Sequence, residues 1–262
     1  MQKKKHNVLI TGASEGIGME LARIHASHDD QLVLVARRGD RLELLKEELE
    51  SRFGVEVMVL AKDLTLPGAV DEVFHATEKA GLQIDVLINN AGFGHYNFFV
   101  DSPWEKEARM IELNITALTH LTKLYLPGMK ARGYGRMMQV ASIASFFPGP
   151  LMSVYFATKA YVLNFSQALS AELKGSGVTS TALCPGPTKS GFQAAAAVVE
   201  NQTMNGKKIP TSAEVALFGY RAMMKGKRVV VHGFGNRVMT LATRLLPTGM
   251  VADMVKKMQQ KR

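Results

Sequence analysis

The sequence predicts an α/β protein with a doubly wound parallel sheet of seven strands, covered by helices on both faces. The first observation is that short, nearly continuous apolar runs alternate with amphipathic stretches along the chain. Parallel strands that helices bury on both faces have this pattern, because neither face meets water. The second observation is a glycine-rich turn directly after the first apolar run, which is typical of the first strand–turn–helix unit of such a sheet.

The amphipathic stretches between the apolar runs, such as 41–53 and 104–132, are expected to be helices. Right-handed crossovers through these helices then give a Rossmann-like three-layer sandwich. No repeat, low-complexity tract or linker divides the chain, so residues 1–262 are expected to form one domain. The expected strands are the seven apolar runs at 7–11, 31–36, 55–61, 85–90, 136–142, 178–184 and 228–234.

Two segments fall outside this alternation. Residues 187–210 form a long connection without a strand, and such connections in compact domains are usually functional, so we expect a substrate lid there. Residues 236–262 are expected to form a helical tail that packs on its own body or on a partner subunit; peripheral contact with a membrane surface is the alternative. The residues of the tail that suggest a helix are Leu241, Leu245, Met250, Met254 and Met258, beside Lys256 and Lys257.

Composition excludes several function classes. The single cysteine, Cys184, rules out a disulfide framework within the chain, and the seven histidines show no metal-ligand spacing, so we predict no metal. The net charge is +9, but no basic stretch is interleaved with aromatic residues, so nucleic acid is not an expected partner. The chain shows neither a secretory signal nor a run of about 20 apolar residues, and we expect a cytoplasmic location.

The turn at residues 11–18 reads TGASEGIG and is expected to hold a dinucleotide. Glycines let the backbone approach a pyrophosphate, and the unpaired N–H groups of the following helix stabilise its charge. The strand–turn–helix context makes the motif specific, although the spacing differs from the commoner G-x-G-x-x-G. The candidate cofactor-binding residues of the turn are Gly12, Ser14, Glu15, Gly16, Ile17 and Gly18.

The end of the second strand indicates which dinucleotide binds. Folds that prefer NAD(H) place an acidic residue here to hydrogen-bond the ribose 2′-hydroxyl. This chain has Arg37 and Arg38 instead, and a guanidinium group pairs well with a 2′-phosphate. The sequence therefore predicts NADP(H) rather than NAD(H).

A tyrosine and a lysine, Tyr155 and Lys159, stand four residues apart in an expected helix. Side chains at i and i+4 lie on the same face, so a phenol and an ammonium group are held side by side. A free phenol has a pKa of about 10 and exchanges protons poorly near neutrality. We expect the ammonium of Lys159 to favour the phenolate and to lower the pKa of Tyr155.

The order of these motifs resembles that of the short-chain dehydrogenase/reductase family, in its compact single-domain branch. The resemblance runs from about Asn7 to Phe234 and implies hydride transfer between a nicotinamide cofactor and a carbonyl or secondary alcohol. The features that carry it are the turn 11–18, NNAG at 89–92, Asn114, Ser142, the pair Tyr155 and Lys159, and PGPT at 185–188.

The resemblance implies a role for each catalytic residue. Tyr155 would be the general acid for carbonyl reduction or the base for alcohol oxidation, and Lys159 would tune it and hold the nicotinamide ribose. Ser142, thirteen positions earlier, would orient the substrate oxygen. Asn114 would bend its helix and anchor a water molecule that relays protons to the lysine.

The same resemblance implies further contacts with the cofactor. One departure concerns Glu15, which stands where some NADP-using relatives carry a basic residue, so Arg37 and Arg38 would bear the 2′-phosphate alone. The other positions implied against the cofactor are Asp63, Leu64, Asn90, Ala91, Gly92, Pro185, Gly186 and Thr188, together with Tyr155 and Lys159.

The expected pocket walls are apolar, which suits a lipophilic ketone or alcohol as the small-molecule substrate. Reduction of a 3-oxoacyl group on an acidic carrier protein is the alternative substrate, and a non-catalytic NADP-binding sensor or scaffold is the alternative of another class. The intact catalytic set favours an enzyme, because a sensor needs no tuned phenol. The helices expected at 104–132 and 154–174 suggest a homodimer or homotetramer. The candidate substrate contacts are Phe93, Phe147, Met152 and Phe192.

Overall fold

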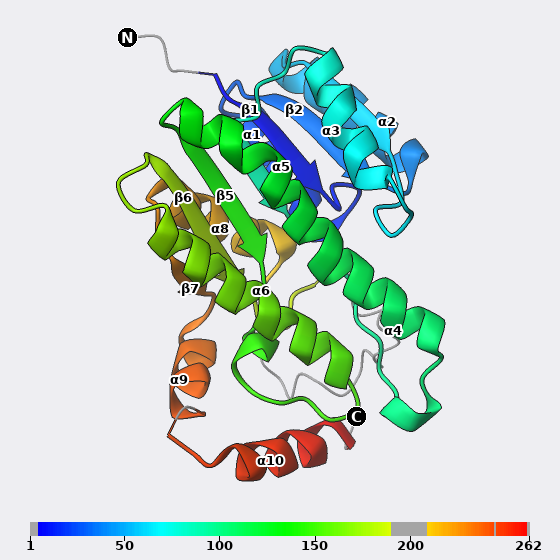
Figure 1. Ribbon diagram of the computed structural model, residues 1–262, viewed down its shortest axis with the longest axis vertical. Coiled ribbons are helices and arrows are strands. Elements are labelled where there is room, and N and C mark those ends of the chain that lie inside the picture. Colours follow the sequence, from blue (N-terminus) through cyan, green and yellow to red (C-terminus); the bar gives the residue numbers. More distant parts are fainter. Residues whose placement is uncertain (1–4, 190–208, 244, 261–262) are drawn as a thin grey trace.

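The computed structural model describes residues 5–189, 209–243 and 245–260 and contains the predicted seven-stranded parallel sheet. The strand order is β3-β2-β1-β4-β5-β6-β7, and every neighbouring pair in it is parallel (Figure 1). The strands are β1 (Asn7–Thr11), β2 (Gln31–Ala36), β3 (Val57–Ala61), β4 (Val86–Asn89), β5 (Gly135–Val140), β6 (Val178–Cys184) and β7 (Val229–Val231).

Helices cover both faces of the sheet. One layer contains α1 (Gly16–Ala26), α2 (Gly39–Phe53) and α8 (Ser212–Met224), and the other contains α3 (Ala69–Lys79), α5 (Leu118–Ala131) and α6 (Ser153–Glu172). In Figure 1, α5 and α6 lie in front of the sheet and α8 lies behind it. The remaining helices are α4 (Trp104–Ile111), α9 (Phe234–Ala242) and α10 (Thr248–Gln260).

The two layers explain why the strands are apolar at consecutive positions. Val8 and Ile10 face the core beneath α1 and α2, whereas Leu9 between them faces the core beneath α5. All three side chains are fully buried. Because successive residues of a strand point to opposite faces, a strand covered on both sides needs apolar residues at every position.

Several predicted elements differ from the structure; the strands expected at 85–90 and 136–142, for example, are Val86–Asn89 and Gly135–Val140. The strand expected at 55–61 begins at Val57, and the one expected at 228–234 ends at Val231, because Gly233, with φ +88°, turns the chain into α9. The helix expected at 104–132 is interrupted by a π-helical segment, Glu112–Ala117, between α4 and α5.

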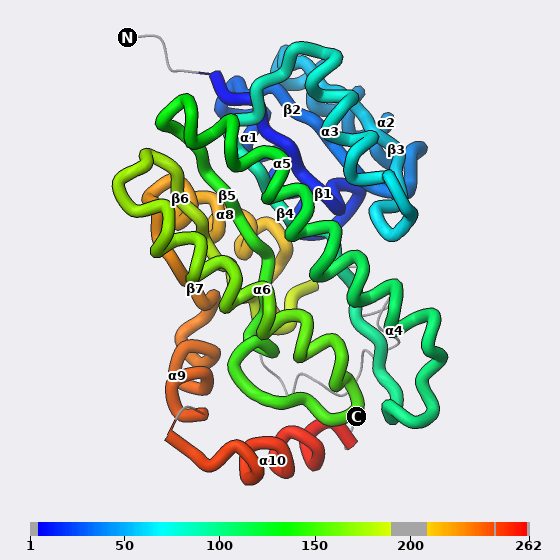
Figure 2. Tube along the Cα trace, in the orientation of Figure 1, coloured from blue at the N-terminus to red at the C-terminus, as the bar shows by residue number. Residues whose placement is uncertain are grey.

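The topology directs the site to the carboxyl ends of the strands. β1 pairs with both β2 and β4, so the strand order reverses there, and the connections leaving β1 and β4 separate to open a crevice. Beyond this edge, α9 and α10 leave the sheet and cross the end of the molecule (Figure 2). Within the described residues, no helix has both the length and the apolar character needed to cross a bilayer.

Candidate active site

The glycine-rich turn forms an open cradle after β1. Gly12 has φ +64°, a left-handed conformation that favours glycine. A Cβ atom on Gly18 would lie 2.4 Å from the carbonyl oxygen of Gly12 and 2.5 Å from Asn90 Nδ2. That amide donates hydrogen bonds to the carbonyl oxygens of Thr11 (3.0 Å) and Gly12 (3.1 Å). Asn90 therefore fixes the turn, and the N-terminus of α1 points into the crevice, where it can bind a diphosphate.

An ion-paired cluster lies beside this cradle. Arg38 Nη2 donates to Ser14 Oγ at 3.1 Å and pairs with Glu15 Oε2 at 2.9 Å, and Arg41 pairs with the same carboxylate at 3.2 Å. Glu15 thus holds Arg38 beside the cradle, and Arg41 is a third cation that the sequence analysis missed. Arg37 is exposed, although it also lines the pocket. Partly exposed pairs are worth about 0–1 kcal/mol, so a phosphate can compete for these arginines.

Asp63 lines the same pocket. Its carboxylate accepts hydrogen bonds from the backbone N–H (3.0 Å) and hydroxyl (2.8 Å) of Thr65 and from Arg109 Nη2 (2.8 Å). Burial raises the pKa of Asp63, but these hydrogen bonds and the nearby positive charges outweigh burial and lower the pKa below its ordinary value. Leu64 beside it is buried and lines the same pocket.

Tyr155 and Lys159 lie in the first two turns of α6 and face the same cavity, as predicted. Both are buried, with 8% and 5% of their surface exposed. Lys159 Nζ lies 5.9 Å from the centroid of the Tyr155 ring and donates a hydrogen bond to the carbonyl oxygen of Val140 at 2.8 Å. The end of β5 therefore holds the ammonium beside the phenol.

The pKa of Tyr155 is raised in this structure, whereas the neighbouring charge of Lys159 led us to expect a lowered value. Burial raises the pKa of Tyr155 to about 12, and a hydrogen bond with the Ser142 side chain only partly opposes this. Burial also lowers the pKa of Lys159 to about 8, against the effect of nearby Cys184. Desolvation penalises both charged forms, and the sequence pattern did not show how deeply the pair is buried. At neutral pH the phenol is therefore protonated, which is the form that a proton donor requires.

Ser142 ends the connection after β5 and caps a short 3₁₀ helix, η3 (Ile143–Phe146). Its hydroxyl accepts from the N–H of Ala144 at 3.1 Å and hydrogen-bonds the Tyr155 phenol. Ser145 was not among the predicted site residues. Its hydroxyl donates to the carbonyl oxygen of Lys159 at 2.7 Å and so ties η3 to α6. This bond fixes the position of Ser142 relative to the phenol.

Asn114 lies in the π-helical segment that interrupts the helix expected at 104–132. Its Nδ2 donates to the carbonyl oxygen of Phe93 and to Thr158 Oγ1, both at 3.0 Å, and its Oδ1 accepts from the N–H of Phe93 at 3.2 Å. The side chain therefore joins the connection after β4 to α6. Gly92 packs tightly here, because a Cβ atom on it would lie 2.9 Å from Asn114 Oδ1. The proton-relaying water molecule stays a prediction.

The PGPT turn closes the other side of the site. The carbonyl oxygen of Pro185 accepts from the N–H of Ile143 at 2.9 Å, and Thr188 Oγ1 donates to the carbonyl oxygen of Gly186 at 2.9 Å. A Cβ atom on Gly186 would lie 2.4 Å from Asn236 Nδ2 in α9. The turn therefore packs against both η3 and the first turn of α9.

Most of the expected lid, residues 190–208 with Phe192, lies outside the described residues.

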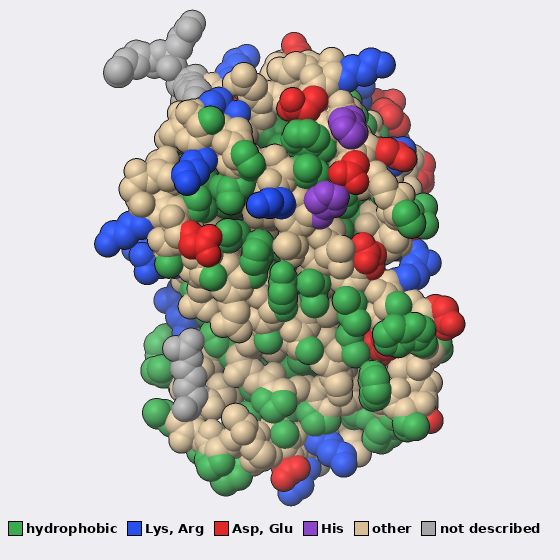
Figure 3. Space-filling view, in the orientation of Figure 1, with side chains coloured by type: hydrophobic (Ala, Val, Ile, Leu, Met, Phe, Trp, Pro, Cys, Tyr) green, Lys and Arg blue, Asp and Glu red, His purple; other side chains and the backbone are tan. Residues whose placement is uncertain are grey.

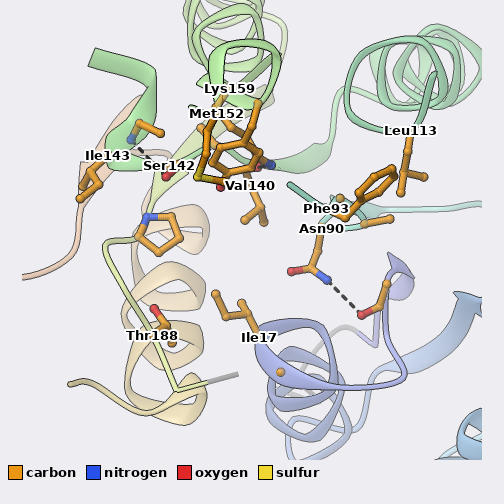
Figure 4. Close-up of a pocket in the computed structure, with 18 of the residues that line it drawn as sticks. Ile17, Asn90, Phe93, Leu113, Val140, Ser142, Ile143, Met152, Lys159 and Thr188 are labelled. Carbon is orange, nitrogen blue, oxygen red and sulfur yellow. Dashed lines mark hydrogen bonds between the residues drawn. The ribbon is translucent and has the colours of Figure 1, made fainter. Parts of the chain in front are cut away.

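These elements enclose a cavity of about 520 Å³. Figure 4 shows Lys159, Ser142 and Met152 on one side of it and Ile17 and Thr188 on the other. The predicted wall residues Phe93, Phe147 and Met152 do line it. Among the described residues, no group of three or more His, Cys, Asp or Glu side chains could hold a metal ion. Wall residues that the sequence analysis missed are Leu113, Ile143, Phe156, Met239, Val255, Met258 and Gln259.

The C-terminal helix forms one wall of this cavity. Val251 and Val255 of α10 are buried in a cluster that includes Tyr155 and Phe156. The hydroxyl of Tyr96 donates to the carbonyl oxygen of Gln259 at 2.8 Å and ties the last turn of α10 to the body. The inner face of the tail thus packs on its own chain. Amphipathic spacing predicted the helix, but it did not show which part of the molecule the apolar face would meet.

Comparisons with known proteins agree with this geometry. The family model described as short chain dehydrogenase matches residues 6–201. The human very-long-chain 3-oxoacyl-CoA reductase is 34% identical over 181 residues, which is 68% of this chain and 57% of that protein. The chain therefore spans a little over half the length of the curated relatives it matches.

Two solved structures are similar over almost the whole chain. A short-chain dehydrogenase from Sphingobium yanoikuyae in complex with NADPH has a TM-score of 0.82 and 33% identity and covers 92% of this chain and 94% of its own. The bulky-bulky ketone specific alcohol dehydrogenase from Comamonas testosteroni has a TM-score of 0.79 and 28% identity, with 93% of both chains covered. By its sequence, its fold and the order of its motifs, the chain belongs to the short-chain dehydrogenase family.

Proposed function

We propose that this protein is an oxidoreductase that transfers hydride between NADP(H) and a carbonyl or secondary alcohol carrying large apolar substituents. The observation that carries the proposal is the meeting of Ser142, Tyr155 and Lys159 on one wall of the cavity, with the phenol buried and hydrogen-bonded to Ser142. Asn114 ties the connection after β4 to the helix that bears the pair.

The crevice fits NADP(H). The turn at residues 12–18 packs so closely on itself and on Asn90 that only glycine fits at positions 12 and 18, and the N–H groups at the start of α1 suit a diphosphate. Arg37, Arg38 and Arg41 supply cations for a 2′-phosphate. Asp63 and Leu64 would contact the adenine end, and Pro185, Gly186 and Thr188 would flank the nicotinamide. The bound cofactor supplies or accepts the hydride.

The chain's own residues then account for the proton. In the direction of reduction, the hydroxyl of Ser142 hydrogen-bonds the substrate carbonyl oxygen and positions it beside the phenol. As hydride adds to the carbonyl carbon, the C=O π-electron pair moves to oxygen, which takes the proton of Tyr155 and gives an alcohol. The ammonium of Lys159 stabilises the phenolate that remains. Alcohol oxidation reverses these steps, with the phenolate as base.

The cavity walls support a lipophilic substrate. The aromatic side chains Phe93, Phe147 and Phe156 line the cavity with Met152 and Met258. Two similar proteins are named for carbonyl substrates with large groups, a bulky-bulky ketone and a very-long-chain 3-oxoacyl-CoA. We therefore favour a bulky ketone or a long 3-oxoacyl chain. The net charge of +9 keeps an acyl group on an acidic carrier protein as the second candidate.

We further propose that the protein is a homo-oligomer. Trp104 of α4 is 65% exposed and Tyr161 of α6 is 38% exposed, on the helices that the sequence analysis assigned to subunit contacts. Sedimentation of the protein at the mass of a single chain would exclude this assembly.

The function is tested by following NADPH absorbance with a panel of bulky ketones, free 3-oxoacyl thioesters and carrier-bound 3-oxoacyl groups. Binding of NADPH and NADH is measured separately by nucleotide fluorescence. We expect turnover with at least one ketone class and tighter binding of NADPH than of NADH. Strong NADPH binding without turnover of any carbonyl would favour the sensor or scaffold.

A further inference from the structure

Helix α9 carries a stripe of exposed apolar side chains. Phe234, Val238 and Leu241 follow one another at spacings of four and three residues, which places them along one side of α9, and Leu245 lies just beyond the end of this helix at Ala242. Phe234 and Leu245 are each 82% exposed. A soluble protein rarely leaves several large apolar side chains together in water unless they meet another apolar surface.

Helix α10 extends this apolar surface. Met250, Met254 and Met258 are each about half exposed, whereas Val251 and Val255 are buried against the body. The two helices also line the cavity, through Met239 of α9 and through Val255 and the partly exposed Met258 of α10. They therefore separate the cavity from the surroundings with apolar side chains on both their inner and outer sides. In Figure 3, hydrophobic side chains lie along the lower end of the molecule, where Figure 1 places α9 and α10.

A basic groove lies directly beside this surface. A concavity of about 450 Å³ between α8, β7 and α9 is lined by Arg221, Lys225, Lys227 and Arg237, and also by the acidic Glu214. Within the described ranges, none of these four cations forms an ion pair with an acidic side chain. In Figure 3, Lys and Arg side chains line the left edge above the hydrophobic ones.

We propose that α9 and α10, together with this basic groove, dock on a bilayer that contains anionic phospholipids. Helices that lie at a bilayer surface carry apolar side chains beside cations. The apolar side chains enter the acyl region, and the cations contact the anionic headgroups. Each cation near an anionic bilayer strengthens binding about fivefold, which corresponds to about 1 kcal/mol. The same surface forms the outside of the cavity wall, so a lipophilic molecule dissolved in the bilayer lies next to the cavity.

Charge disfavours a second copy of this chain on the same surface. A twofold contact is isologous, so it would place the groove with Arg221, Lys225 and Lys227 against or close to its own copy. Unpaired like charges at an interface oppose association, whereas phosphate headgroups neutralise them. The proposal does not depend on the reaction at the catalytic centre, because its readout is binding to vesicles.

The test is flotation of the full chain with phosphatidylcholine vesicles, prepared with and without phosphatidylglycerol. We expect the protein to float with the anionic vesicles and to be released by high salt. The triple variant Arg221→Gln, Lys225→Gln, Lys227→Gln should bind about 100-fold more weakly, from about fivefold per charge. The variant Phe234→Ser, Leu241→Ser, Leu245→Ser should also lose binding. None of these six residues lines the cavity, so turnover of a water-soluble ketone should be unchanged.

A matched control carries Leu44→Ser and Leu66→Ser, which alter two side chains of similar exposure (66% and 60%) on other elements. It should bind vesicles as the unmodified protein does. Equal flotation of all variants, or no flotation of the unmodified protein, would overturn the proposal. A smaller sedimenting species for the α9 variant without vesicles would also overturn it, because the stripe would then be a contact between copies.

Discussion

Lys159 Nζ is held by the carbonyl oxygen of Val140 at 2.8 Å and lies 5.9 Å from the centroid of the Tyr155 ring. The ammonium is therefore anchored to the end of β5. Together with the burial of both side chains, this arrangement keeps the phenol protonated at neutral pH, with a pKa of about 12. Under the proposed function, the phenol would donate its proton in reduction, and oxidation would require the phenol to ionise.

This relationship predicts how oxidation depends on pH. Because the pKa of Tyr155 is raised above 10, the fraction of phenolate grows about tenfold per pH unit below that value. We expect the rate of alcohol oxidation at saturating NADP⁺ to rise through pH 7 to 9 without a plateau in that range. Initial rates in buffers of constant ionic strength measure this. A plateau beginning near pH 7 would show that the bound cofactor or substrate lowers the pKa of Tyr155 by several units.

The arginine cluster predicts the basis of cofactor preference. The variant Arg38→Asp removes a cation beside the cradle and places a carboxylate next to Glu15. We expect KM for NADPH to rise about 10- to 100-fold, in line with the loss of about 1.5–3 kcal/mol from a charged hydrogen bond, and KM for NADH to change little. Arg52→Asp, an exposed arginine at the end of α2, is the matched control and should leave both values unchanged. A parallel rise for both cofactors would contradict a 2′-phosphate role.

The glycine cradle predicts a steric effect on folding and binding. A Cβ atom on Gly18 would approach the carbonyl oxygen of Gly12 to 2.4 Å, so Gly18→Ala must displace the turn. We expect a loss of about 1–3 kcal/mol in the free energy of unfolding, typical of overpacking, together with weaker NADPH binding. Urea denaturation and nucleotide fluorescence measure the two effects. Gly235→Ala in α9 is the control, because its Cβ meets nothing within 4 Å and it should be neutral or slightly stabilising.

A buried carboxylate near the start of β1 predicts acid sensitivity. Asp30 accepts hydrogen bonds from the backbone N–H and Nδ1 of His6 (3.0 and 3.1 Å) and pairs with His25 Nδ1 at 2.7 Å. Burial raises the pKa of Asp30, but the hydrogen bonds from His25 and His6 outweigh burial and lower it. A carboxyl group with a lowered folded-state pKa contributes stability above its unfolded pKa, and that contribution is lost as the pH falls through the folded value.

The variant Asp30→Asn should therefore reduce the free energy of unfolding by about 2–4 kcal/mol at pH 7, because it breaks a buried charged network. The difference in the free energy of unfolding between the variant and the unmodified protein should shrink as the pH falls below about 4. Below that pH the Asp30 carboxylate contributes less and less to the stability of the unmodified protein. Thermal unfolding of both proteins across this pH range measures whether the stability difference shrinks or grows on acidification. A difference that grows on acidification would show that Asp30 is not the stabilising charge.

The fold and the identity of the motif residues could be predicted from the sequence because both rest on local patterns. The strand runs are apolar at consecutive positions, as Val8, Leu9 and Ile10 show, since both sheet faces are covered. The i and i+4 spacing placed Tyr155 and Lys159 on one face, and the structure confirms this. The family resemblance implied that Asn114 bends its helix, and the structure has a π-helical segment at this residue.

The remaining features depend on distant contacts that local patterns do not contain. The pKa of Tyr155 was predicted in the wrong direction because the sequence showed the neighbouring charge of Lys159 but not the burial of both groups. The docking of Val255 and Gln259 against the cavity follows from where α10 lies, which spacing within the helix does not determine. Arg41 stands three residues after Arg38 and pairs with the same carboxylate of Glu15, so this spacing in the sequence could have indicated the third cation.

The most direct test of the account is the variant Tyr155→Phe, which removes the phenol oxygen and keeps the ring. We expect turnover of the best ketone to fall by at least about 100-fold, the range for loss of a general acid, while the dissociation constant for NADPH changes little. Circular dichroism confirms that the variant is folded. Turnover within a few-fold of the unmodified protein, at unchanged NADPH affinity, would contradict the central claim that this buried phenol supplies the proton.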